Sequence, residues 1–197
     1  DIPEFADRNR DETPVLCAIA RLAPEKNLGL LLEAFRRILA ARPVILLILG
    51  DGPERAVLEA HITAWGLTGA VRLLGHCDNV YPYLRRADVF IHTCQFEGFG
   101  YTMLEALACS TAVVATDCPY GPREVLGGGN YGVLTPPDDP AALAAAVLRL
   151  LNDPAGRRTL AARGLERARE LSVRRMADAY AAEFLKLHNP DRERRTA

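Results

Sequence analysis

Short apolar runs alternate along the chain with longer segments in which apolar residues recur at helical spacing. Each run has about the length of a strand, and most are apolar at consecutive positions rather than at every second one. This pattern is typical of parallel strands covered on both faces, because neither face of such a strand meets water. Six strands are therefore predicted, over residues 14–20, 43–50, 70–75, 88–93, 111–117 and 131–136.

The segments between and after these runs have the pattern of helices. Seven helices are predicted, over residues 28–41, 53–65, 79–86, 101–109, 138–152, 154–170 and 172–187. Repetition of strand, helix and strand with right-handed crossovers predicts an α/β fold. We expect a Rossmann-like, doubly wound parallel sheet of about six strands with helices on both faces.

Residues suited to helix starts stand where the predicted helices begin. Asn27 is expected to cap the first long helix, and Pro53 to occupy the first turn of the next. Similar caps are expected for the last three helices, from Asp138 or Asp139, from Asp153 and from Ser172.

Length and composition fit one folded domain, with 197 residues, 49% apolar and 25% charged. We expect a linker or tail over 1–13, the domain over 14–188 and a frayed tail over 189–197. The chain begins with Asp1 and a charged segment, which suggests a piece of a longer chain.

Charge and cysteine usage exclude several function classes. A net charge of −1 gives no electrostatic reason to bind nucleic acid or an anionic membrane. No apolar run approaches the roughly 20 residues of a membrane span. The cysteines lack any C-x-x-C pair, so we expect reduced thiols in a cytoplasmic protein and no metal site. They are Cys17, Cys77, Cys94, Cys109 and Cys118.

The predicted strands end in loops rich in glycine and polar residues: "RLAPEKN", "GDGPE", "GHCDN", "TCQFEGFG" and "TDCPYGPRE". Ligands of open parallel sheets bind beyond the carboxyl ends of the strands. Arg21 and Lys26 lie just before a helix and suit a diphosphate, as a guanidinium fork and a point charge. In the alternative interpretation Lys26 is solvated and Arg21 pairs with a nearby acid.

The other loops carry weaker signals. Gly50 and Gly52 do not complete a dinucleotide fingerprint, because Arg55 stands where its third glycine belongs. They predict a tight strand-to-helix turn, with or without ligand contact. Among the histidines, only His76 is expected to meet a ligand, since the other three lie on helix patterns or in a buried strand.

The segment "FEGFGYTMLEAL" is the richest in candidate chemistry. Gly98 and Gly100 allow the backbone to approach a ligand, and the amides of residues 100–102 begin a helix whose dipole favours negative charge. Glu97 and Glu105 could accept hydrogen bonds from the hydroxyls of one elongated ligand. In the alternative interpretation Glu97 caps the helix and Glu105 is merely an exposed helical residue.

The ordered set "RLAPEKN", "LILGDGPE", "VRLLGH" and "ADVFIHTCQFEGFGYTMLEALACSTAVVATD" resembles the C-terminal, donor-binding half of group 1 retaining glycosyltransferases with the GT-B fold. In this resemblance Glu97 and Glu105 form the family's E-x7-E motif. "CPYGPREVL" followed by "YGVL" is similar to a branch that uses UDP-activated, often N-acetylated, sugars.

The resemblance implies a role for each candidate residue. Arg21 and Lys26 would hold the diphosphate and neutralise the leaving group, and together with Glu97, which would bind sugar hydroxyls, they are the catalytic candidates. Glu105 would bind the ribose. Gly50 and Gly52 belong to the family's donor-binding turn. Backbone around His76 and Cys77 would meet the base, and backbone around Gly98, Phe99, Gly100, Tyr101 and Thr102 would meet sugar and phosphate.

The resemblance also implies what lies beyond this chain. The donor would be a nucleotide sugar, a UDP-sugar by the branch, with no cofactor and no metal. The acceptor would bind between this domain and an N-terminal domain that the chain lacks, so the chain alone would transfer nothing. A cytoplasmic location follows, with attachment to the inner face of the membrane through the missing domain left open. Two alternatives stay open: half of a GT-B epimerase or phosphorylase, and a non-catalytic α/β nucleotide-binding or interaction module.

Overall fold

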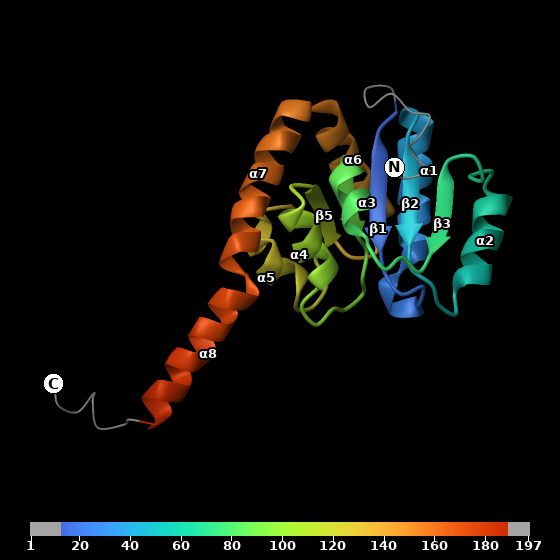
Figure 1. The fold of residues 1–197 in the computed structure, drawn as a ribbon. Coiled ribbons are helices and arrows are strands. Elements are labelled where there is room, and N and C mark those ends of the chain that lie inside the picture. Colours follow the sequence, from blue (N-terminus) through green and yellow to red (C-terminus); the bar gives the residue numbers. More distant parts are fainter. Residues whose placement is uncertain (1–12, 189–197) are drawn as a thin grey trace.

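A computed structural model describes residues 13–188 (Figure 1). The predicted tail at 189–197 and all but the last residue of the predicted linker lie outside the described residues. Among the described residues, no helix is both long enough and apolar enough to cross a membrane.

Six parallel strands form one sheet in the order β3-β2-β1-β4-β5-β6. They are β1 (Val15–Ile19), β2 (Ile45–Leu49), β3 (Val71–Gly75), β4 (Val89–His92), β5 (Ala112–Thr116) and β6 (Val133–Thr135). All six predicted strands are confirmed. Strand order reverses between the adjacent strands β1 and β4, which makes the carboxyl ends of these two strands the topological switch point of the sheet.

The seven predicted helices are also present, together with shorter elements that the sequence pattern did not predict. The long helices are α1 (Leu28–Ala41), α2 (Arg55–Ala64), α3 (Tyr81–Arg86), α4 (Tyr101–Ala108), α6 (Pro140–Asn152), α7 (Pro154–Glu170) and α8 (Val173–His188). The additional ones are η2 (Pro24–Lys26), α5 (Pro122–Val125) and η3 (Gly127–Gly129).

The core has one apolar layer on each face of the sheet. Helices α1, α2 and α6 contribute to one layer, and α3, α4, α5 and α7 to the other. Successive residues of β1 alternate between them: Leu16 belongs to the first, and Val15 and Cys17 to the second. Because both faces are covered, neighbouring strand positions are all apolar, which explains the unbroken runs in the sequence.

The helix starts were predicted correctly where an aspartate precedes a proline. Asp139 accepts a hydrogen bond from the Ala142 amide at 2.8 Å, and Asp153 accepts one from the Gly156 amide at 2.9 Å. For the last helix, Ser172 Oγ lies 3.5 Å from the Arg175 amide nitrogen.

The predictions for the starts of the first two helices, at Asn27 and Pro53, were wrong. Asn27 makes no side-chain cap of α1, because its backbone is left-handed (φ +46°) and its side-chain Nδ2 donates to Asp138 Oδ1 instead, at 3.1 Å. Pro53 precedes α2, which begins at Arg55. The Glu54 amide donates a hydrogen bond to the Leu22 carbonyl, which keeps this part of the loop outside the helix.

The turn after β2 is packed against the loop after β1. A Cβ on Gly50, whose φ is +128°, would lie 1.9 Å from the Ala20 carbonyl oxygen. One on Gly52 would lie 2.4 Å from the Leu22 carbonyl oxygen. The predicted tight turn is confirmed, and its glycines set the position of the loop that carries Arg21.

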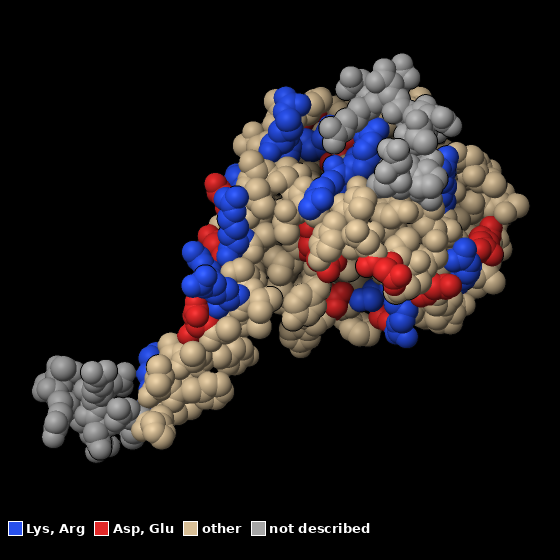
Figure 2. All heavy atoms as spheres, in the orientation of Figure 1, with Lys and Arg blue, Asp and Glu red and all other residues tan. Residues whose placement is uncertain are grey.

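Helix α8 extends away from the rest of the domain, and none of its side chains is buried (Figure 1). The visible face of its outer half is largely uncharged (Figure 2). Five of its exposed large apolar residues recur every three or four positions, which places them along one stripe. The five are Val173, Met176, Tyr180, Phe184 and Leu187, and Leu185 is also exposed but does not follow this spacing.

We predict that Gly50→Ala lowers the free energy of unfolding by more than about 2 kcal/mol, because the new methyl group collides with backbone that cannot move away. Urea denaturation would measure the change. Gly29→Ala is the matched control: it lies in α1 with open space around its Cβ position, so it should be neutral or stabilise by up to about 1 kcal/mol. Equal stability of Gly50→Ala and the parent chain would contradict the role assigned to this turn.

Candidate functional site

A cleft of about 370 Å³ lies at the carboxyl ends of β1, β2 and β3 and reaches the N-terminal turn of α4. Five of the predicted site residues line it: Arg21, Gly50, His76, Cys77 and Thr102. These five predicted residues therefore lie together at one edge of the sheet. Gly52 acts through the backbone packing described above.

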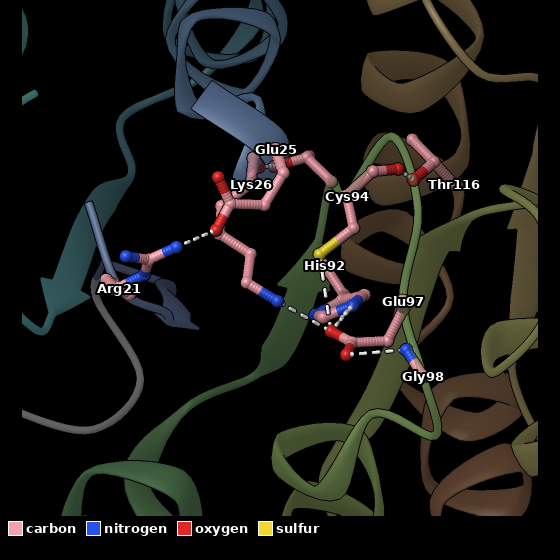
Figure 3. Close-up of polar contacts among 9 residues, drawn as sticks. Arg21, Glu25, Lys26, His92, Cys94, Glu97, Gly98 and Thr116 are labelled. Atoms are coloured by element: carbon pink, nitrogen blue, oxygen red, sulfur yellow. Dashed lines mark hydrogen bonds and ion pairs between the residues drawn. The ribbon is translucent and has the colours of Figure 1, made fainter. Parts of the chain in front are cut away.

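Lys26 and Glu97 form an ion pair beside this edge, with Lys26 Nζ 2.8 Å from Glu97 Oε2 (Figure 3). Only 19% of the Lys26 side chain and 17% of the Glu97 side chain are exposed. The pair joins the loop after β1 to the loop after β4, across the switch point. The alternative in which Lys26 is solvated is therefore wrong.

Glu97 has further partners that were not predicted from the sequence. Its Oε1 accepts a hydrogen bond from the Gly98 amide at 3.0 Å. Its Oε2 also accepts from the Cys94 thiol at 3.5 Å and lies 3.3 Å from His92 Nε2. His92 and Lys26 both stabilise the ionised carboxylate, so they hold the pKa of Glu97 far below its usual range despite partial burial.

The contact between Lys26 and Glu97 also shifts the pKa of Lys26, upward where that of Glu97 is shifted downward. Burial by itself would lower the pKa of the Lys26 ammonium, but its hydrogen bond with Glu97 and the neighbouring negative charge raise that pKa above the usual value. Lys26 and Glu97 are therefore both charged near neutral pH, which leaves an ammonium and a carboxylate ready to meet a polar ligand.

Arg21 forms an ion pair with Glu25, as the alternative interpretation expected. Its side chain nevertheless remains 66% exposed at the wall of the cleft. A guanidinium in this position is held by one surface partner and can still donate to a ligand, since it carries five N–H donors.

Glu105 lies on α4 and is only partly buried. Burial raises the pKa of its carboxyl group. Among the described residues, no hydrogen bond or ion pair joins it to Glu97. The prediction that it is simply exposed is wrong, and its predicted role toward ribose stays a prediction.

The glycine-rich loop after β4 leads directly into α4. Gly100 adopts φ +89° and directly precedes α4, so the amides of residues 100–102 begin the helix as expected. No side chain of the described residues caps this helix, which excludes the predicted alternative that Glu97 is its cap. The Phe99 ring packs on Tyr101, with ring centres 5.3 Å apart, and Tyr101 is 67% exposed.

His92 and Cys94 are the residues that the sequence reasoning missed. His92 was assigned only to a buried strand, yet it is the last residue of β4, where a parallel strand presents its end to the ligand edge. An ionisable residue at that position is a signal that the sequence alone offers. His76, the predicted histidine, lines the cleft but is 81% exposed and lies 3.3 Å from Asp78.

Side-chain atoms of His92, Cys94 and Glu97 lie within 4.8 Å of one another, a separation that three metal ligands can have. The Lys26 ammonium, however, already contacts the carboxylate oxygen that a cation would need. Its positive charge would repel a divalent ion at the same oxygen. This donor set therefore disfavours a metal, and the predicted absence of a metal requirement stays a prediction.

Fold and site together define an α/β domain of the doubly wound class, with a cleft beside its switch point. The chain belongs to the group 1 glycosyltransferase family: the family model described as glycosyl transferases group 1 matches residues 3–167. The fold matches solved glycosyltransferase structures of the GT-B type, so the predicted fold class is confirmed.

Several curated relatives carry glycosyltransferase names. A phosphatidyl-myo-inositol mannosyltransferase of Mycolicibacterium smegmatis is 38% identical over 177 residues, covering 85% of this chain and 45% of the relative. The N-acetylgalactosamine-N,N'-diacetylbacillosaminyl-diphospho-undecaprenol 4-alpha-N-acetylgalactosaminyltransferase of Campylobacter jejuni is 35% identical over 138 residues, covering 70% and 37%.

Among solved structures, Anabaena HepE in complex with UDP superposes with a TM-score of 0.79 at 27% identity, covering 90% of this chain and 50% of HepE. HepE is also known in complex with UDP-glucose. The chain therefore spans about half, or less, of the length of these matched proteins.

We predict that Glu97 makes the free energy of unfolding depend on pH in the acid range. A carboxyl group whose folded pKa is lowered stabilises the fold above its unfolded pKa, roughly 4.3, and this contribution is lost as pH falls toward the folded pKa. Glu97→Gln should therefore lose less unfolding free energy than the parent chain between about pH 5 and pH 3. Urea denaturation at both values would measure the loss.

Glu105→Gln is a control for which the opposite change in acid-induced loss of unfolding free energy is expected. Burial raises the folded pKa of Glu105, so its protonation favours the fold as pH falls, and its removal should make the acid loss steeper. If both variants followed the acid dependence of the parent chain, the electrostatic description of the site would be wrong.

Proposed function

We propose that this chain is the donor-binding half of a retaining glycosyltransferase that moves a hexose or N-acetylhexosamine from a UDP-sugar to a glycan, lipid-linked or small-molecule acceptor. The observation that carries the proposal is the cleft at the carboxyl edge of the sheet, together with the paired Lys26 and Glu97, which join the loops after β1 and β4 at the same edge. Family membership and the nucleotide complexes of HepE support this assignment.

Each charged group has a role that follows from the chemistry of sugar transfer. When the bond between sugar and diphosphate breaks, negative charge grows on the departing diphosphate, and cations fixed nearby stabilise it. Lys26 and Arg21 are these cations. Lys26 comes from the turn directly before α1, and Arg21 from the wall of the cleft.

The carboxylates act as acceptors for hydroxyl groups. Glu97 is held ionised, so it accepts hydrogen bonds from sugar hydroxyls and is unsuited to act as an acid near neutral pH. Glu105 binds the ribose hydroxyls. Retention follows from attack on the same face of the sugar that the diphosphate leaves, without a covalent sugar–enzyme step.

The acceptor is bound by a separate domain. The apolar stripe of α8 is exposed along its length, and large apolar side chains in such a row mark a surface that another element covers. In our proposal an N-terminal acceptor domain covers it in the longer protein. The protein works in the cytoplasm or at the inner face of the membrane, where lipid-linked acceptors are within reach.

We predict that the purified chain binds UDP more tightly than GDP or ADP in titration calorimetry. We also predict that Lys26→Met weakens UDP binding by about tenfold or more, because a charge-assisted contact with the diphosphate is lost. Glu105→Gln should also weaken UDP binding. Lys186→Met is the matched control, since Lys186 is the other lysine of the chain and pairs with Glu183 on α8. Equal effects of the two lysine variants would contradict the diphosphate role.

We predict that the isolated chain transfers no sugar from UDP-glucose or UDP-N-acetylglucosamine to any acceptor, because half of the active-site cleft is contributed by another domain. Chromatography of the products formed from labelled UDP-sugar would measure transfer. Efficient transfer by these 197 residues alone would refute the division into donor and acceptor halves.

A further inference from the structure

His92 contacts the site from inside the sheet. It is the last residue of β4, only 4% of it is exposed, and β4 lies between β1 and β5. Within residues 13–188 its Nε2 is buried without a well-formed hydrogen bond, and Glu97 Oε2 lies 3.3 Å from it (Figure 3). That separation slightly exceeds a normal N–H···O bond, so the contact is mainly electrostatic.

The two oxygens of Glu97 are unequally occupied. Oε2 meets three groups, namely Lys26 Nζ at 2.8 Å, His92 Nε2 at 3.3 Å and Cys94 Sγ at 3.5 Å. Oε1 accepts one bond, from the Gly98 amide at 3.0 Å. A carboxylate oxygen has two lone pairs, so Oε1 retains acceptor capacity that Oε2 has lost. Oε1 is therefore the oxygen of Glu97 with acceptor capacity left for a ligand.

Lys26 and His92 differ in their freedom to move. Lys26 has four rotatable methylene groups, and in the proposed function its ammonium turns toward the diphosphate. Glu97 then loses its strongest partner at the moment when it must hold a sugar hydroxyl. His92 cannot follow, because its backbone is fixed in the sheet and its ring is enclosed.

We propose that His92 is a positioning residue that holds Glu97 Oε2 against the end of β4, so that Oε1 stays aimed at the donor sugar when Lys26 leaves for the diphosphate. This inference rests on the proposed function and adds a second, immobile partner to its sugar-binding carboxylate. His92 itself does not touch the donor.

Binding experiments separate this role from a general structural one. In titration calorimetry of the chain, His92→Leu should weaken binding of UDP-glucose or UDP-N-acetylglucosamine, whichever binds the parent chain more tightly, by about tenfold, the loss expected when one hydrogen-bonding partner of a charge is removed. Affinity for UDP alone should stay within about twofold, because UDP lacks the transferred sugar that Glu97 would hold. His92→Gln keeps an N–H donor and should restore most of the loss.

The matched control is His61→Leu, which changes a histidine of α2 that stacks on Trp65 and should affect neither ligand. In the Glu97→Gln background, His92→Leu should cause no further loss, because the two residues act as one unit. Equal weakening of UDP and UDP-sugar by His92→Leu, or full additivity with Glu97→Gln, would overturn the proposal.

A second measurement needs no nucleotide. In carbon-detected NMR of the chain, the Glu97 carboxyl group should stay ionised to the lowest pH at which the parent chain is folded. Its titration should move to higher pH in His92→Leu, and less so in His92→Gln. Lys26, Cys94 and Cys118 are the other titratable groups that act on Glu97, and they are present in both variants.

The two measurements distinguish a failure of the proposed function from a failure of the positioning role of His92. If the parent chain bound no nucleotide, the proposed function would fail, and the NMR titration would still decide whether His92 acts on Glu97. If the Glu97 titration were the same in His92→Leu and the parent chain, the positioning role would be refuted even with tight UDP binding. Should His92→Leu not fold, comparison of His92→Gln with His92→Asn gives the same test.

Discussion

The contact between Lys26 and Glu97 is the constraint around which the site is organised. It joins the loop after β1 to the loop after β4, and these are the two strands between which the order of the sheet reverses. Two parallel strands with helices on opposite sides leave a gap between their following loops, and ligands bind there. An ion pair with both side chains largely buried closes part of that gap and fixes the two loops relative to each other.

The pair also carries a cost that the fold must offset. Removing a carboxylate and an ammonium from water is unfavourable, and their mutual attraction alone does not always repay it. Here the carboxylate gains further donors from the Gly98 amide and the Cys94 thiol, and the His92 ring adds an electrostatic contact at 3.3 Å. A site with this many donors on one carboxylate is suited to a ligand that brings its own charge and hydroxyl groups, because such a ligand can exchange partners with it.

The backbone around the cleft is built to allow this approach. Gly50 and Gly52 let the turn after β2 lie against the loop that carries Arg21, where any Cβ would meet carbonyl oxygen. Gly100 lets α4 begin directly behind Glu97. The glycines and the charged residues therefore act together: the glycines bring the loops close, and the ion pair holds them.

The sequence by itself determined the fold class and the edge at which the site lies. Its unbroken apolar runs required strands covered on both faces, and the polar loops after them had to meet at one edge, because parallel strands all end on the same side. Only the tertiary structure decided which groups touch. His92 comes from a different strand end than Lys26, and nothing in local spacing states that both meet one oxygen of Glu97. The errors at Asn27 and Pro53 have the same origin: local propensity favoured a cap and a first-turn proline, and contacts with Asp138 and Leu22, both outside those helices, decided otherwise.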